Sequence, residues 1–199
     1  MLSKPTFWCL ISAILFGISP TLSKYLLTSI HPILLASLLY LGAGLATLPQ
    51  LKTPSIQSAQ EWRRIVGAIF FGGIAGPILL LYGISQVGAA TSSLLLNMES
   101  VATAILGWLF FREHLTGKII LCVLLVTLGG GFLCFSQEFT LHIGALWIIL
   151  ACICWGLDNH YTATIEELSP AQSTCIKGLC AGLFNLLLFS LAMSYPSIE

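Results

Sequence analysis

Long apolar stretches separated by short polar segments dominate this sequence. Each stretch is close to the roughly 20 residues that a helix needs to span a hydrocarbon core of about 30 Å. The ten-residue alternation of apolar and polar positions that marks membrane-spanning strands is absent, and backbone groups inside lipid must be bonded within their own segment. The pattern therefore predicts an all-α, polytopic transmembrane helix bundle of about seven helices. The expected spans are residues 7–28, 30–49, 63–85, 88–111, 119–137, 143–165 and 170–194.

Composition strengthens this prediction and excludes several classes of protein. The chain is 57% hydrophobic and only 8% charged, whereas soluble domains carry about 25% charged residues. Eight basic residues balance eight acidic ones, so no surplus of positive charge is present to bind nucleic acid. The expected surroundings are the lipid bilayer. The seven cysteines lie in apolar stretches, and neither they nor the four histidines have the spacing of metal ligands. We therefore expect no metal and no cofactor.

The distribution of basic residues predicts an orientation. With the N-terminus in the cytoplasm, the outer segments hold no Lys or Arg except Lys24, near the end of the first span. The positive-inside rule therefore favours a multi-pass protein of the cell (inner) membrane with a cytoplasmic N-terminus and Glu199 outside. The first apolar stretch is expected to stay as a signal anchor. The basic residues expected inside are Lys4, Lys52, Arg63, Arg64, Arg112 and Lys118.

A sparse internal repeat divides the chain. The segment WCLISAILFG (8–17) aligns with WIILACICWG (147–156), and two shorter matches follow at similar spacing. We expect a complete first unit of five helices at 1–138 and a partial second unit of two helices at 139–199. After five helices the second unit begins on the opposite face of the membrane. Inverted repeats of this kind are typical of secondary transporters. The shorter matches are His31-Pro32 with Ser169-Pro170, and Ala43-Gly44-Leu45 with Ala181-Gly182-Leu183.

One region makes the resemblance to a family specific. The residues that carry it are Tyr82–Ser85, Ala89–Leu96, Glu99 and Gly107–Leu115, which include an acidic residue just after the helix. This part of the chain resembles an EamA-type domain of the drug/metabolite transporter superfamily. Ser100 departs from the family pattern, which usually has proline there. Residues 145–189 resemble the start of a second such domain. Because family members normally carry two five-helix domains, the resemblance implies a fragment or a natural truncation about three helices short.

Two charged residues are predicted to form an ion pair inside the membrane. Charge within a bilayer is costly, which makes each such residue a functional candidate. Asp158 and Lys177 are equidistant from the turn near residues 166–170. In an antiparallel hairpin both lie roughly 13 Å below the surface, at 1.5 Å per residue. The pair either opens with substrate or proton, or it is a fixed structural contact.

A polar stripe on the fourth span is predicted to face a cavity. Ser92, Glu99 and Thr103 recur at i, i+7 and i+11, which is one face of a helix. Glu99, expected near the middle of that helix, is a candidate proton acceptor because a low dielectric favours a neutral carboxyl group. Helix-packing hydrogen bonds are the alternative role for Glu99, and they are the favoured one for the neighbouring Ser93, Asn97 and Ser100.

Two further features complete the candidate site. Asn159 and His160 follow Asp158, and the run from Trp155 to Asn159 resembles a motif of one EamA-like subgroup. For His160 a hydrogen-bonded packing role is favoured over titration. Three positions are expected to break a helix, where proline removes a backbone donor, or to serve close helix packing, which is the favoured role. These positions are Pro20, Gly76 and Pro77.

The resemblance implies an integral-membrane secondary transporter that moves a small organic metabolite or drug by alternating access. No ATP-binding motif is present, so a gradient of substrate or of an ion such as the proton would drive it. We expect no enzymatic activity, because no nucleophile–base pair has useful spacing. The alternative is a non-transporting or partner-dependent membrane fragment of such a transporter, for example a homodimer. The expected substrate or ion pathway comprises Asn97, Glu99, Thr103, Asp158, Asn159, His160 and Lys177.

Overall fold

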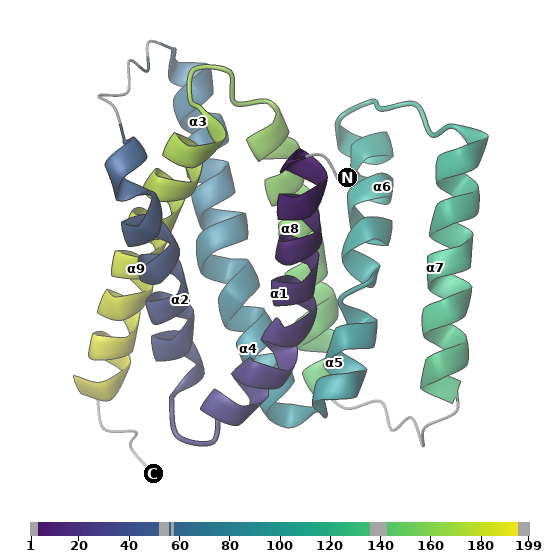
Figure 1. The fold of residues 1–199 in the computed structure, drawn as a ribbon, viewed down its shortest axis with the longest axis horizontal. Helices are drawn as coiled ribbons and strands as arrows, with labels where there is room; N and C mark the ends of the chain where they lie inside the picture. The colour runs from purple at the N-terminus through teal and green to yellow at the C-terminus, as the bar shows by residue number, and fades with distance from the viewer. Residues whose placement is uncertain (1–3, 52–55, 57, 136–142, 195–199) are drawn as a thin grey trace.

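The computed structural model describes residues 4–51, 56, 58–135 and 143–194. Every regular element in these ranges is helical (Figure 1). The elements are α1 (Lys4–Leu26), α2 (Pro32–Thr47), the 3-10 turn η1 (Leu48–Gln50), α3 (Ala59–Ala68), the π-helical segment η2 (Ile69–Ala75), α4 (Gly76–Gln86), α5 (Ala89–Leu95), α6 (Met98–Phe110), α7 (Gly117–Phe135), α8 (Ile143–Ala163) and α9 (Pro170–Ser194).

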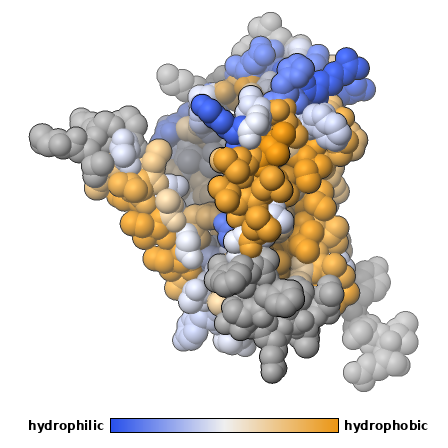
Figure 2. Space-filling model, turned by 90° about the vertical axis from the view of Figure 1, so that its right-hand side faces the viewer, coloured by the Kyte–Doolittle hydropathy of each residue, from blue (hydrophilic) through white to orange (hydrophobic). Residues whose placement is uncertain are grey.

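These elements form seven columns that cross the bundle, because α3, η2 and α4 are continuous and α5 leads directly into α6 (Figure 1). Six columns are long and apolar enough to cross a membrane, and the remaining one, α7, contains the shorter apolar stretch Gly117–Gly129. Figure 2 shows a broad hydrophobic surface across the middle of the molecule, with hydrophilic side chains gathered at its upper end. The predicted all-α, polytopic bundle is confirmed, and the chain is a multi-pass membrane protein.

Helices α2 and α9 pack side by side through glycine (Figure 1). A Cβ atom built on Gly44 would lie 2.7 Å from the backbone nitrogen of Leu179, and one on Gly182 would lie 2.8 Å from that of Leu41. Glycine is therefore required on both helices, since small residues let membrane helices approach closely. A glycine of each helix thus contacts the backbone of the other, which is the pattern expected when α2 and α9 are related by a two-fold axis.

The first residues of α2 and α9 are also capped alike. His31 accepts a hydrogen bond from Ile33 through its Nδ1 atom, and Ser169 accepts one from Gln172 through its hydroxyl. Together with the glycine contacts, these caps fall at the positions that the sequence repeat aligned. The division into units at 138 and 139 stays a prediction, and that boundary lies outside the described residues.

The helix widens in the segment just before Gly76 and Pro77, where the sequence predicts a break. Segment η2 is π-helical, with the backbone N–H of Gly76 donating to Phe71 O, five residues earlier. Pro77 has no N–H to donate, so the helix leaves preceding carbonyl groups without an internal partner. Gly72 O accepts instead from the Tyr40 hydroxyl and from Trp155 Nε1. Side chains of neighbouring helices thus replace the missing backbone bonds.

The predicted break at Pro20 is wrong. Helix α1 continues through Pro20 as a single element, and its axis bends in the C-terminal half (Figure 1). A single missing hydrogen bond can be accommodated by bending, without ending the helix.

The predicted continuous fourth helix is also wrong. It divides into α5 and α6, and Glu99 lies in the first turn of α6 rather than mid-helix. The Asn97 amide donates to Leu94 O at 3.1 Å and the Asn97 backbone N–H donates to the same carbonyl. An asparagine side chain that competes for backbone carbonyls in this way ends a helix.

The close packing of α2 on α9 gives the first prediction. Replacing Gly44 by Ala puts a methyl group against α9 and should destabilise the fold by roughly 1–3 kcal/mol. Gly42 lies on the same helix, and a Cβ atom added there would have nothing within 4 Å, so Gly42→Ala should be neutral or stabilising through helix propensity. Thermal unfolding of the two purified variants in detergent measures the difference. Equal shifts of the melting temperature would show that the glycine contact is not needed.

Candidate functional site

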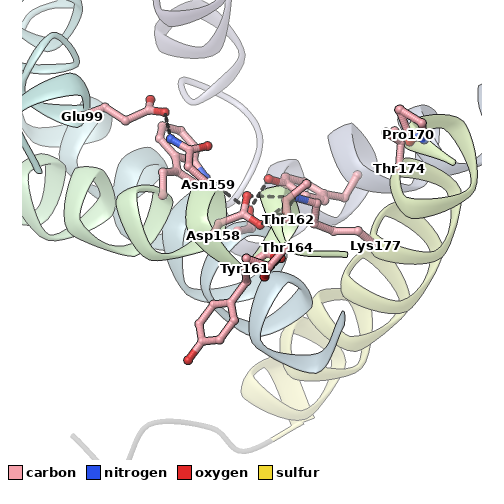
Figure 3. A network of polar contacts seen from close by, with 12 residues as sticks. Glu99, Asp158, Asn159, Tyr161, Thr162, Thr164, Pro170, Thr174 and Lys177 are labelled. Carbon is pink, nitrogen blue, oxygen red and sulfur yellow. Dashed lines mark hydrogen bonds and ion pairs between the residues drawn. The ribbon is translucent and has the colours of Figure 1, made fainter. Parts of the chain in front are cut away.

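Helix α8 carries the candidate site because it lies between two groups of helices. It packs against α3, η2 and α4, and it also packs against α6. Successive residues of an α-helix point about 100° apart. Asp158, Asn159 and His160 therefore reach different neighbours, as Figure 3 shows for the first two.

The predicted ion pair between Asp158 and Lys177 is present. Lys177 Nζ lies 2.8 Å from both carboxylate oxygens of Asp158. The Thr162 hydroxyl donates to Asp158 Oδ1 at 2.9 Å, and Asp158 is buried, with 8% of its surface exposed. In this conformation both oxygens of the carboxylate are engaged.

A glycine of the π-helical segment makes room for this carboxylate. A Cβ atom on Gly72 would lie 2.1 Å from Asp158 Oδ2, so the carboxylate rests directly on the Gly72 backbone. Tyr40 and Trp155 donate to the carbonyl of the same residue. The widened helix, the ion pair and the two aromatic residues thus form one packed unit between α2, α8 and α9.

A second polar cluster joins α8 to α6. Asn159 Nδ2 lies 3.1 Å from Glu99 Oε1 and 3.1 Å from the Thr103 hydroxyl oxygen. The stripe expected on the fourth span therefore meets α8, as Figure 3 shows for Glu99 and Asn159. The cluster lines a cavity of about 380 Å³, within the range of small-molecule sites. The polar residues that line it are Glu99, Ser100, Thr103, Glu113, His114 and Asn159.

His160 is held between two hydrogen-bond acceptors. Its Nε2 atom lies 2.9 Å from Thr103 O, and its Nδ1 atom lies 3.1 Å from Glu113 Oε1. The imidazole therefore joins α8 to α6 and to the segment that follows α6.

Glu113 is a functional candidate that the sequence reasoning did not include. Its backbone N–H donates to Gly107 O at 3.0 Å, after Arg112 has turned the chain with a positive φ of 55°. A Cβ atom on Gly107 would lie 2.7 Å from Glu113 Oε2, so glycine leaves space for the carboxylate. The available signal was the acidic residue after the helix in the family resemblance.

The predicted pathway residues divide into separate groups. Asp158 of α8 pairs with Lys177 of α9 beside η2. The second group lies between α8 and α6 and consists of Glu99, Thr103, Asn159 and His160. Asn97 belongs to neither group, because its side chain is exposed and bonds to the backbone of α5. The residues come together only because α8 presents two faces to two sets of helices.

A buried pair at the start of α3 was also missed. Glu61 is 4% exposed and pairs with Arg64, for which the sequence predicts only a place in the positively charged inner loops. Glu61 Oε2 accepts the backbone N–H of Glu166 at 3.1 Å, and Arg64 donates to Thr164 O at 2.6 Å. The pair ties α3 to the turn between α8 and α9.

Metal chemistry finds no support in the side chains that the structure describes. Among them, no group of three or more His, Cys, Asp or Glu residues could hold a metal ion. The contacts that the described side chains make in the site are hydrogen bonds and ion pairs.

The ion pair gives the second prediction. Asp158→Asn leaves the Lys177 charge buried without its partner, which costs about 3–5 kcal/mol when a buried pair is broken. The double change Asp158→Asn with Lys177→Met removes both charges and should recover most of the lost stability, and with it the lost activity. Thermal unfolding of the purified variants measures the stability, with the exposed Glu166→Gln as the control. Equal losses in the single and double variants would contradict a coupled pair.

Comparison with known proteins agrees with this architecture. Residues 3–134 match the EamA-like transporter family. The chain is also 27% identical over 170 residues to an "Uncharacterized transporter" of Methanothermobacter thermautotrophicus, an alignment that covers 74% of this chain. The chain spans about half the length of that relative, of which 50% is covered. The family is one of transporters, not of enzymes. Because the match extends over more than half of its residues, the chain belongs to the EamA-like transporter family.

Proposed function

We propose that the chain moves a small organic metabolite or drug across the membrane by alternating access. The observation that carries the proposal is the polar cavity between α6, α7 and α8. Polar side chains are costly within apolar helices and commonly mark substrate pathways. Glu99, Thr103 and Asn159 line about 380 Å³ of space there. Membership of a transporter family supports the same conclusion.

The lining of the cavity favours a particular kind of solute. Two carboxylates, Glu99 and Glu113, face it together with hydroxyl and amide groups. Such a lining is rich in hydrogen-bond acceptors, and it carries carboxylates but no Lys or Arg among its described residues. A solute with an amine or several hydroxyl groups complements it best.

The proposal includes an N-terminus in the cytoplasm and a place in the inner membrane. Arg63, Arg64, Arg112 and Lys118 lie at the end of the bundle where α1 begins (Figure 1), which supports this orientation under the positive-inside rule. Lys24, the exception in the sequence, donates to the carbonyls of Ile84 and Ser85 at 2.8 and 2.9 Å. Because Lys24 caps the C-terminal carbonyls of α4, its place at the other end of the bundle, away from the four basic residues above, has a structural reason.

Exchange with protons is the proposed driving force. Glu99 bonds to Asn159 in the cavity, and Glu113, in the segment after α6, contacts His160 of α8. A solute that binds these acceptors competes with the proton for them. Binding of one and release of the other are then linked.

Uptake into liposomes tests the transport proposal. The purified 199-residue chain is reconstituted and offered a defined mixture of amines, amino acids, sugars and organic acids, and the solutes inside are measured by mass spectrometry. At least one solute should enter faster than into empty liposomes. Asn159→Ala and Glu99→Gln should slow its entry about tenfold, the effect of losing roughly 1.4 kcal/mol of interaction.

Two control variants keep this test specific. Thr127→Ala removes an exposed hydroxyl of α7, and Glu166→Gln removes an exposed carboxylate of the turn before α9; both should leave uptake unchanged. A folded chain that admits none of the solutes would contradict the proposal. A stable dimer or partner complex without flux would favour the alternative of a partner-dependent membrane fragment.

Proton coupling is tested on the same liposomes. With a dye inside that reports pH, entry of the solute should change the internal pH, and collapse of the proton gradient with an uncoupler should abolish accumulation. Glu113→Gln removes the carboxylate that contacts His160, and under this proposal the dependence of uptake on pH should flatten. Accumulation that persists without a proton gradient would contradict coupling, though not transport itself.

A further inference from the structure

A second and larger cavity, of about 590 Å³, opens at the end of the bundle where α3 begins and α8 ends. It shares no described lining residue with the cavity of the Glu99 cluster. Its lining combines cationic, polar and aromatic side chains. They are Gln60, Arg63, Arg64, Phe111, Tyr161 and Thr164.

The cavity is positively charged and holds donors that are not in use. Two arginines are among its described lining residues, and no carboxylate is. Arg64 is engaged with Glu61 and with Thr164 O. Arg63 is exposed and makes no ion pair or hydrogen bond with any residue that the structure describes. A guanidinium group in this setting is suited to a phosphate or carboxylate oxygen.

The aromatic wall fixes a third donor. A Cβ atom on Gly67 would lie 3.0 Å from the Tyr161 ring, so the ring rests on the backbone of α3. The same ring lies parallel to Phe71, with centroids 6.1 Å apart, and edge-on to Phe111. Figure 3 shows the phenol pointing away from the Asp158–Lys177 network. Its hydroxyl group makes no hydrogen bond to a described residue.

The position of the cavity indicates the source of the anion. Arg63 lies in the second turn of α3, roughly 6 Å along the helix from its first residue. A position about one turn inside the end of a membrane-spanning helix is close to the layer between lipid headgroups and tails. The neighbouring Trp62 is 52% exposed, as is typical of a residue at this interface. A cationic, partly apolar cavity between helices at this level has the chemistry that binds anionic headgroups.

We propose that this cavity binds the phosphate group of an anionic phospholipid. Arg63 is the principal ligand, Tyr161 and Gln60 donate further hydrogen bonds, and the Phe111 ring contacts the apolar part of the lipid. A bound headgroup would link α3 to the C-terminal end of α8 and to the residue that follows α6. This binding site is independent of the proposed transport.

Thermal stability in detergent tests the proposal. The purified full chain is titrated with phosphatidylglycerol, with phosphatidylcholine and with soluble glycerol 3-phosphate, and unfolding is followed by tryptophan fluorescence. Phosphatidylglycerol should raise the melting temperature in a saturable manner, and the other two should raise it far less. Glycerol 3-phosphate acting as strongly as the lipid would overturn the lipid as the source of the phosphate.

Variants locate the site. Arg63→Gln should weaken the apparent affinity for phosphatidylglycerol about tenfold, and Tyr161→Phe should weaken it measurably while keeping the ring. Lys118→Gln removes one positive charge at the same end of the bundle but outside the cavity, so it should leave the affinity unchanged. Equal weakening by Arg63→Gln and Lys118→Gln would overturn the proposal in favour of general surface attraction. If Arg63→Gln fails to fold, an unchanged affinity in Tyr161→Phe overturns it instead.

Discussion

The carbonyl groups that Pro77 leaves without a partner organise this bundle. In a bilayer such groups cannot be hydrated, so other parts of the protein must bond to them. Tyr40 and Trp155 donate to Gly72 O, and Asn185 Nδ2 donates to Gly73 O at 3.1 Å. These donors come from α2, α8 and α9. One break in one helix thereby holds three other helices at defined positions.

The same break positions the charged pair. Because Gly72 has no side chain, the Asp158 carboxylate can lie against the widened turn and meet Lys177 from α9. Both charges are then compensated inside the apolar bundle. The pair fixes α8 in rotation about its axis. With one face of α8 held toward η2, Asn159 is directed toward Glu99 and Thr103 on α6.

The polar groups of α8 thus make two kinds of contact on its two sides. On the side of η2 and α9 the polar groups are engaged with one another and buried. On the side of α6, Asn159 meets Glu99 and Thr103 at a cavity, and His160 contacts Glu113. In the proposed transport the solute binds on the α6 side, while the buried contacts on the other side hold α8 in place.

The all-α membrane bundle, the resemblance to the family and an ion pair between Asp158 and Lys177 could be predicted from the sequence. Long apolar stretches permit only helices in lipid, and two opposite charges at equal depth on a hairpin can pair. The division of the fourth helix at Asn97, the passage of α1 through Pro20 and the contact of Glu113 with His160 emerge only in the folded bundle. Each depends on which distant group meets a given side chain or carbonyl. His160 shows this clearly, because its contacts with Thr103 O and Glu113 exist only once α8 has packed on α6.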